Sequence, residues 1–261
     1  MTVKLTEYFQ DAKQQFLVVA GPCSIESREQ LLDTAKVVAD SGATLLRGGI
    51  YKLRTSPDSF QGLGEDAYLL VKEAKEQLGL PFIAEITDPR QIPLFQDYVD
   101  VIQVGSRNMY NYALLKELSE LDLPVVLKRG FSATLDEWIK AADYLRSGGN
   151  DKVILCERGI RGFDNKTRNV LDLASVSYLK KYSDHIVMVD PSHATGDSNL
   201  VADMAKAAIF AGADGIMVEI HPNPEQALSD GPQALTFQAY EKLMQEIKTL
   251  LPYVQKELVR S

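Results

Sequence analysis

Short apolar runs rich in β-branched residues alternate with longer amphipathic segments along the whole of this 261-residue sequence. This alternation is typical of repeated strand–helix units joined into a parallel sheet. We predict eight strands, at residues 16–21, 43–48, 81–86, 101–106, 124–129, 153–158, 186–191 and 215–220. Amphipathic helices are predicted between them, with clear patterns at residues 28–42, 65–79, 136–149, 203–215 and 236–251. The first four of these segments end in glycine, a residue that favours helix termination.

Eight strand–helix units favour an α/β fold of one type, a single (β/α)8 TIM barrel. Such barrels have about 250 residues, close to the length of this chain. No linker or low-complexity stretch interrupts the alternation, so we expect residues 1–261 to form one catalytic barrel domain without a regulatory domain. A doubly wound sheet is the alternative, and it is disfavoured because no G-x-G-x-x-G motif follows a predicted strand.

Charge and composition exclude several classes of partner. The net charge of −8 argues against nucleic-acid and anionic-membrane binding, which need a broad basic surface. The apolar runs are too short to cross a bilayer, and the N-terminus lacks the apolar core of a secretory signal, so a cytoplasmic location is expected. In that reducing compartment Cys23 and Cys156 are not expected to form a disulfide.

The ends of the predicted strands carry polar residues suited to chemistry. Barrel enzymes build their sites at the C-terminal ends of the strands, where this chain has Cys23, Arg47, Glu85, Arg107, Lys128, Arg158, His193 and Glu219. Cys23, His193 and Glu219 follow strands that become neighbours when the barrel closes, and Asp230 lies in the next loop. This ligand set favours iron, manganese, cobalt or zinc over magnesium, without selecting among the four.

The other cysteine and histidines have plainer interpretations. Cys156 lies inside an apolar run and is interpreted as a packed core residue. His185 precedes a strand and is expected at the surface, whereas His221 lies close enough to Glu219 to support a ligand.

A cluster of cations is predicted on the same face, although the chain as a whole is acidic. Its members are Arg47, Lys52, Arg54, Arg107, Lys128, Arg158 and Arg161. Arginine binds carboxylate and phosphate oxygens in pairs and lysine acts as a point charge, so a small ligand carrying both groups is indicated. The long loop after the second strand adds the hydroxyl groups of Thr55 and Ser56.

Seven motifs together resemble the 3-deoxy-7-phosphoheptulonate (DAHP) synthase family, in the short branch related to 3-deoxy-octulosonate 8-phosphate synthases. They are AGPCSIES (20–27), RGGIYKLRTSPDSFQGLGE (47–65), VGSRNMYN (104–111), LKRG (127–130), CERGIR (156–161), DPSHATG (190–196) and VEIHPNPEQALSDGP (218–232). The resemblance implies a TIM-barrel enzyme of aromatic amino acid synthesis, which condenses phosphoenolpyruvate with erythrose 4-phosphate and water. It also implies a homo-oligomer, either a dimer or a tetramer.

The resemblance also assigns roles to residues of this chain. It implies a divalent metal bound by Cys23, His193, Glu219 and Asp230. Phosphoenolpyruvate would bind Arg47, Lys52, Arg107, Lys128 and Arg158, with Lys52 near the reacting centre, and the aldose phosphate would bind Arg54, Thr55, Ser106 and Arg107. Leu53 stands where many relatives have proline, which leaves the charged groups unchanged. Cys23, Lys52, Glu85 and His193 are the candidate catalytic residues, Glu85 for water activation and Asp190 for orienting a neighbouring Lys or His.

Two other functions are considered. An octulosonate-phosphate synthase would use arabinose 5-phosphate on a similar barrel, but that branch typically carries a K-A-N-R-S-like string where this chain reads K-L-R-T-S. A non-catalytic phosphosugar-binding barrel would be expected to have a damaged metal set, whereas all four candidate ligands are present.

Overall fold

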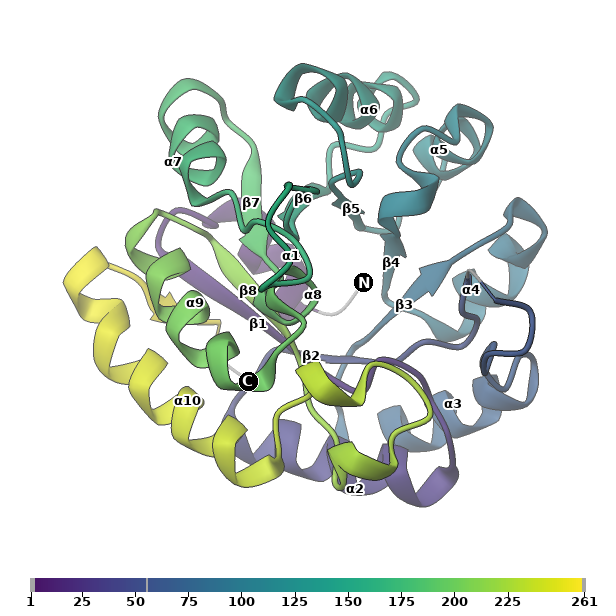
Figure 1. The fold of residues 1–261 in the computed structure, drawn as a ribbon. Coiled ribbons are helices and arrows are strands. Elements are labelled where there is room, and N and C mark those ends of the chain that lie inside the picture. Colours follow the sequence, from purple (N-terminus) through teal and green to yellow (C-terminus); the bar gives the residue numbers. More distant parts are fainter. Residues whose placement is uncertain (1–2, 55, 260–261) are drawn as a thin grey trace.

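Eight parallel strands close into a barrel surrounded by helices in the computed structural model, which describes residues 3–54 and 56–259 (Figure 1). β1 pairs with both β2 and β8, and this double pairing closes the sheet. The strands are β1 (Gln15–Gly21), β2 (Leu45–Arg47), β3 (Phe82–Ile86), β4 (Val101–Val104), β5 (Val125–Lys128), β6 (Val153–Glu157), β7 (Ile186–Val189) and β8 (Gly215–Glu219). All eight predicted strands are therefore confirmed, with ends that differ by one or two residues.

The outer layer consists of helices that follow the strands in turn. They are α2 (Arg28–Ser41), α3 (Asp66–Leu78), α4 (Ile92–Tyr98), α5 (Tyr112–Ser119), α6 (Leu135–Ser147), α7 (Leu173–Tyr182), α9 (Ser198–Phe210) and α10 (Phe237–Leu250). Local signals set their ends: Gly42 terminates α2 in the left-handed conformation, and Thr134 forms a capping box with Glu137 at the start of α6. α9 begins five residues before the predicted segment, because Asp197 caps it.

Side chains on the two faces of the strands form two separate cores. Along β1, Val18 and Ala20 pack outward against the helices, whereas Leu17 and Val19 point into the barrel. The two-residue period of a strand produces this division. Cys156 lies in the inner core, which confirms its interpretation as a packed residue.

The N-terminal end of the barrel is closed by elements that the sequence patterns did not predict. α1 (Val3–Gln10) places Leu5 and Tyr8 in the inner core, and the Tyr8 hydroxyl donates to the carbonyl oxygen of Asp214 at 3.2 Å. A short strand, β9 (Glu257–Leu258), pairs with the start of β1. With this end sealed, the C-terminal ends of the strands are left for a site.

One expectation about exposure is wrong. His185, predicted at the surface, is only 4% exposed, and the Lys180 ammonium donates to its carbonyl oxygen across the α7–β7 turn. Burial lowers the pKa of this imidazole. The short turn draws the residue before β7 under the helix layer, which a count of strand positions does not reveal. Among the described residues, no helix is both long and apolar enough to cross a membrane.

Candidate active site

Four potential metal ligands meet at the C-terminal end of the barrel. Cys23, His193, Glu219 and Asp230 each contribute one atom to a group in which all four atoms lie within 4.8 Å of one another. Cys23 follows β1 and Glu219 ends β8, and the two strands pair in register up to Gly21 and Glu219. The predicted neighbourhood of these residues is confirmed by the geometry.

A short helix holds His193 in the group. α8 (Pro191–Thr195) begins after Asp190, whose carboxylate accepts from the His193 backbone N–H at 2.9 Å. The other oxygen of Asp190 lies 2.7 Å from His193 Nδ1 and 2.6 Å from Lys128 Nζ. Burial alone would raise the pKa of Asp190, but its interactions with His193 and Lys128 outweigh burial and hold the pKa well below its ordinary value. The ionised carboxylate therefore accepts a hydrogen bond from Nδ1–H and orients the ring.

The atoms facing the centre of the group suit a bound cation. Because Nδ1 carries the ring proton, Nε2 of a neutral His193 presents a lone pair, and it lies 3.1 Å from Glu219 Oε1. Burial lowers the pKa of His193, which favours the neutral ring, although Asp190 and Glu219 oppose the shift. Among the described residues, no aligned hydrogen-bond donor reaches Glu219 Oε1. His193 Nε2 and Glu219 Oε1 therefore face each other with free electron pairs. Together with the Cys23 thiol and the Asp230 carboxylate, they form a ligand set suited to a transition metal.

The protonation of these residues follows from their surroundings. Burial raises the pKa of the Cys23 thiol to about 12, with Glu219 adding to the rise and Lys52 opposing it. For Glu219, burial raises the pKa, but His193 and Arg47 lower it by more, so the net shift is downward. Burial also raises the pKa of Asp230, but His193 and a hydrogen bond that Cys23 donates to Oδ2 at 3.0 Å lower it by more. Without a cation the site holds a thiol beside two carboxylates, so metal binding would expel the thiol proton.

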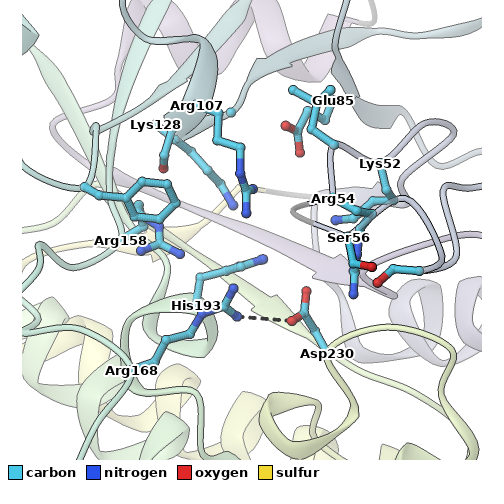
Figure 2. Close-up of a pocket in the computed structure, with 15 residues that line it drawn as sticks. Lys52, Arg54, Ser56, Glu85, Arg107, Lys128, Arg158, Arg168, His193 and Asp230 are labelled. Atoms are coloured by element: carbon cyan, nitrogen blue, oxygen red, sulfur yellow. Dashed lines mark hydrogen bonds and ion pairs between the residues drawn. The ribbon is translucent and has the colours of Figure 1, made fainter. Parts of the chain in front are cut away.

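A basic pocket of about 280 Å³ opens beside these ligands (Figure 2). The cationic side chains that line it are Lys52, Arg54, Arg107, Lys128, Arg158 and Arg168. Glu85 and Asp230 line the same pocket, together with Ser56 and Ser106. Lys52, Arg54 and Ser56 lie on one side, facing Arg107, Lys128 and Arg158 across the opening. Cations around so small a volume favour a compact ligand with several negative charges.

Aromatic stacking keeps several of these like charges together. Arg107 and Arg158 lie over the ring of Phe131, with guanidinium carbons 5.5 and 4.8 Å from its centroid. Arg161 lies over the same ring at 5.3 Å but is exposed to solvent. The negative face of the ring partly offsets the repulsion among the guanidinium groups.

Two predicted anion-binding residues have different surroundings from the rest. Arg47 is 4% exposed and lies beneath the pocket, where its Nη1 is 3.0 Å from Glu219 Oε1. Lys52 connects the ligand group to the basic pocket, because its Nζ lies 2.9 Å from Cys23 Sγ while its side chain lines the pocket. Thr55 falls outside the described residues.

Glu85 is held at the pocket wall. Its Oε2 accepts from Gln103 Nε2 at 3.2 Å, and its Oε1 lies over Gly105, where an added Cβ would approach to 2.0 Å. Gly105 has an ordinary φ of −70°, so close packing rather than backbone conformation requires a glycine there. The carboxylate therefore has a defined place in the pocket wall, on the same side as Lys52 and Arg54.

Comparison with known proteins decides the family. A model described as "DAHP synthetase I family" matches residues 3–255. This chain belongs to the DAHP synthetase I family. A phospho-2-dehydro-3-deoxyheptonate aldolase of Thermotoga maritima is 47% identical over 235 residues, which cover 90% of this chain and 70% of that protein. A 2-dehydro-3-deoxyphosphooctonate aldolase of Azoarcus sp. is 30% identical over 94% of this chain and 92% of its own length.

Solved structures agree with this family assignment. The crystal structure of the Thermotoga maritima DAHP synthase superimposes with a TM-score of 0.91 at 45% identity, covering 94% of this chain and 72% of that one. A truncated form of the Thermotoga maritima enzyme gives a TM-score of 0.87 at 42% identity and covers 94% of this chain and 90% of that one. The predicted TIM barrel is confirmed both by the strand topology and by these family members.

Two polar residues of this family member were missed by the sequence reading. Arg168 lines the pocket, and its Nη1 lies 3.1 Å from Asp230 Oδ1 and 2.8 Å from Gln233 Oε1. Gln233 is 2% exposed and donates to Glu219 Oε2 at 2.6 Å. The available signal for Arg168 was the basic loop after β6, of which only the first part was considered.

The loop that carries Asp230 is tied to the loop after β1. Glu26 accepts from the backbone N–H of Leu228 at 2.9 Å and lies 3.3 Å from Nε2 of His221. The hydroxyls of Ser24 and Ser229 are 2.9 Å apart. His221, predicted to support a ligand, contacts Glu26 and the backbone N–H of Asn223, so it stabilises the loop.

Proposed function

We propose that this protein is a metal-dependent DAHP synthase, which converts phosphoenolpyruvate, erythrose 4-phosphate and water into DAHP and inorganic phosphate. One observation carries the proposal: four candidate metal ligands and a six-cation pocket share one end of the barrel. His193 and Asp230 belong to both, and Lys52 of the pocket contacts the ligand Cys23. Family membership and a relative of this activity at 47% identity support it.

Cys23, His193, Glu219 and Asp230 would hold the divalent ion, whether manganese, iron, cobalt or zinc. When bound, such an ion supplies Lewis-acid polarisation of an aldehyde oxygen. Around it, Lys52, Lys128 and Arg158 would bind the carboxylate and phosphate of phosphoenolpyruvate. Arg54, Ser106 and Arg107 would bind the phosphate at the far end of the aldose. We include Arg47 as a support beneath the phosphoenolpyruvate site, through its ion pair with Glu219.

The cations do more than attract substrate. Two anionic reactants repel one another, and fixed positive side chains on two walls of the pocket offset that repulsion while aligning the reacting carbons. C3 of phosphoenolpyruvate then forms a bond with the aldehyde carbon, which leaves positive character at C2. Lys128, held by Asp190, is placed to orient the carboxylate attached to that carbon.

Water completes the reaction. We propose that Glu85 orients a water molecule and takes its proton as the oxygen adds to C2. The resulting hemiketal phosphate then loses its hydroxyl proton and becomes the C2 ketone as the carbon–oxygen bond to the phosphate breaks, and inorganic phosphate leaves. The two protons of the water end on the oxygen of the former aldehyde and on the phosphate. Glu85 suits this role because its carboxylate lines the pocket on the side of Lys52 and Arg54, across from Arg158.

An octulosonate-phosphate synthase is the second candidate, because two proteins named 2-dehydro-3-deoxyphosphooctonate aldolase are 30% identical over 94% and 91% of this chain. A phosphate-release assay distinguishes the two activities. Phosphoenolpyruvate is mixed with either erythrose 4-phosphate or arabinose 5-phosphate, before chelation, after chelation and after a divalent ion is restored. We expect faster release with erythrose 4-phosphate, loss on chelation and recovery with the ion. Preference for arabinose 5-phosphate would overturn the substrate assignment, and full activity after chelation would overturn the metal dependence.

We further propose a cytoplasmic homo-oligomer, a dimer or a tetramer. Light scattering on the purified protein after size-exclusion chromatography would measure the assembly directly. A monomer at micromolar concentration would contradict this part of the proposal.

A further inference from the structure

The two carboxylates of the ligand group each have one oxygen engaged and one oxygen turned toward the centre. For Asp230, Oδ1 lies against Arg168, whereas Oδ2 faces the Cys23 sulfur at 3.0 Å. For Glu219, Oε2 accepts from Gln233, whereas Oε1 faces His193 Nε2 at 3.1 Å and also lies 3.0 Å from Arg47 Nη1. The same arrangement therefore occurs at both carboxylates.

A single nitrogen connects the two engaged oxygens. Nη1 of Arg168 has two hydrogens, and it lies 3.1 Å from Asp230 Oδ1 and 2.8 Å from Gln233 Oε1. Gln233 in turn donates a hydrogen bond from Nε2 to Glu219 Oε2 at 2.6 Å. The orientation of this amide follows from its partners, because arginine only donates and an ionised carboxylate only accepts.

We propose that Arg168 and Gln233 form a relay that selects which carboxylate oxygens face the metal. Arg168 engages Oδ1 of Asp230 and, through Gln233, Oε2 of Glu219, so Oδ2 and Oε1 are presented to the ion. Both are positioning residues, since they act through the ligands. The inference rests on the proposed metal-dependent function and extends it to two residues outside the ligand set.

The position of Arg168 gives the relay a link to substrate. Arg168 belongs to the loop between β6 and α7 and lines the anion pocket, where its side chain extends toward Asp230 (Figure 2). Gln233, by contrast, is buried in the 3₁₀ turn Gly231–Gln233 that follows Asp230. Asp230 itself has a left-handed φ of 54°, a conformation that needs support from its surroundings in a residue other than glycine. The side chain of Asp230 contacts Arg168 through Oδ1 and Cys23 through Oδ2.

The test measures metal binding rather than turnover. Chelator-treated protein is titrated with Co²⁺, and affinity is measured by calorimetry while visible absorption reports the coordination of the ion. Arg168→Met removes the donors but keeps much of the apolar stem, and Gln233→Leu breaks the second link. Removing such outer hydrogen bonds typically weakens metal binding by about 10- to 100-fold, which is the range that we expect for both variants. We also expect an altered Co²⁺ spectrum.

Arg161→Met is the matched control, because it removes the same charge from the same loop while Arg161 is exposed and lies over Phe131. We expect it to bind Co²⁺ like the unsubstituted protein. Unchanged affinity and spectrum in Arg168→Met would overturn the relay alone. Equal weakening in Arg161→Met would also overturn it, because a general charge effect would then explain the loss. Failure of the unsubstituted protein to bind Co²⁺ would overturn the metal-dependent function and the relay together.

Discussion

The proposed role of Glu85 can be tested by a substitution at a neighbouring residue, which leaves Glu85 itself in the sequence. A Cβ added at Gly105 would lie 2.0 Å from Glu85 Oε1, and Cβ atoms in proteins essentially never come closer than 3.0 Å to such an atom. Gly105→Ala must therefore push the carboxylate oxygen by about 1 Å. Because Gly105 has φ −70° and ψ 160°, alanine fits the backbone there without strain.

A displacement of about 1 Å in a catalytic group can lower the rate by roughly 100-fold, equivalent to about 2.7 kcal/mol in the activation barrier. We expect Gly105→Ala to lower kcat by about this factor in the phosphate-release assay. Co²⁺ affinity should stay unchanged, because the three atoms nearest to the added methyl group all belong to Glu85, which is not a candidate ligand. The thermal unfolding temperature should also change little, because the carboxylate at the end of the Glu85 side chain can move to make room for the methyl group.

A double-mutant cycle shows whether the loss acts through Glu85. Glu85→Ala removes the atoms that the new Cβ would meet, so Gly105→Ala should cost less than about twofold in that background. If Gly105→Ala lowers kcat by the same factor with and without Glu85, the carboxylate is not the affected group. A kcat within twofold of the parent in the single Gly105→Ala variant would also refute the reasoning.

Three further predictions concern the metal and the core. Cys23→Ala should remove the sulfur-to-cobalt absorption of the Co²⁺ complex, whereas Cys156→Ala, in the inner core, should retain it; retention in the first variant would exclude Cys23 as a ligand. Because burial raises the pKa of the Cys23 thiol to about 12, the thiol carries its proton at neutral pH, so Co²⁺ affinity should rise about tenfold per pH unit as the pH increases. Calorimetry in buffers of different ionisation enthalpy should show one proton released, and a flat profile would contradict this. Arg129→Met should lower the free energy of unfolding by about 3–5 kcal/mol, because it leaves Glu157 buried without its 2.8 Å partner; urea denaturation measures this, and a loss below 1 kcal/mol would show that the pair is unimportant.

The barrel was predictable from sequence because both faces of each strand are buried, which requires a continuous run of apolar residues. Each strand is an apolar run, and each strand is followed by a helix with its own end signals. Closure of the sheet then brings Cys23 and Glu219 together without any knowledge of the loops. Topology therefore predicts that Cys23, His193 and Glu219 lie together, because the C-terminal ends of neighbouring strands meet, whereas Asp230 depends on the path of the loop after β8.

Side-chain direction and loop paths were harder to predict. Arg47 ends β2 as expected, but its side chain turns under the pocket to contact Glu219. Arg168 reaches Asp230 from 62 residues away along an irregular loop, which has no periodicity to place it. α1 is short and lies apart from the repeating units, so its closure of the barrel becomes visible only in the inner core that contains Leu5 and Tyr8.

The central claim is that side chains distant in sequence assemble one divalent-ion site beside one anion pocket. Anomalous diffraction from crystals soaked with Co²⁺ and phosphoenolpyruvate tests it most directly. The predicted map has a single strong peak bonded to Cys23, His193, Glu219 and Asp230, with the phosphoenolpyruvate anion among Lys52, Lys128 and Arg158. A cobalt peak elsewhere, or none, together with an anion bound away from those cations, would contradict the account.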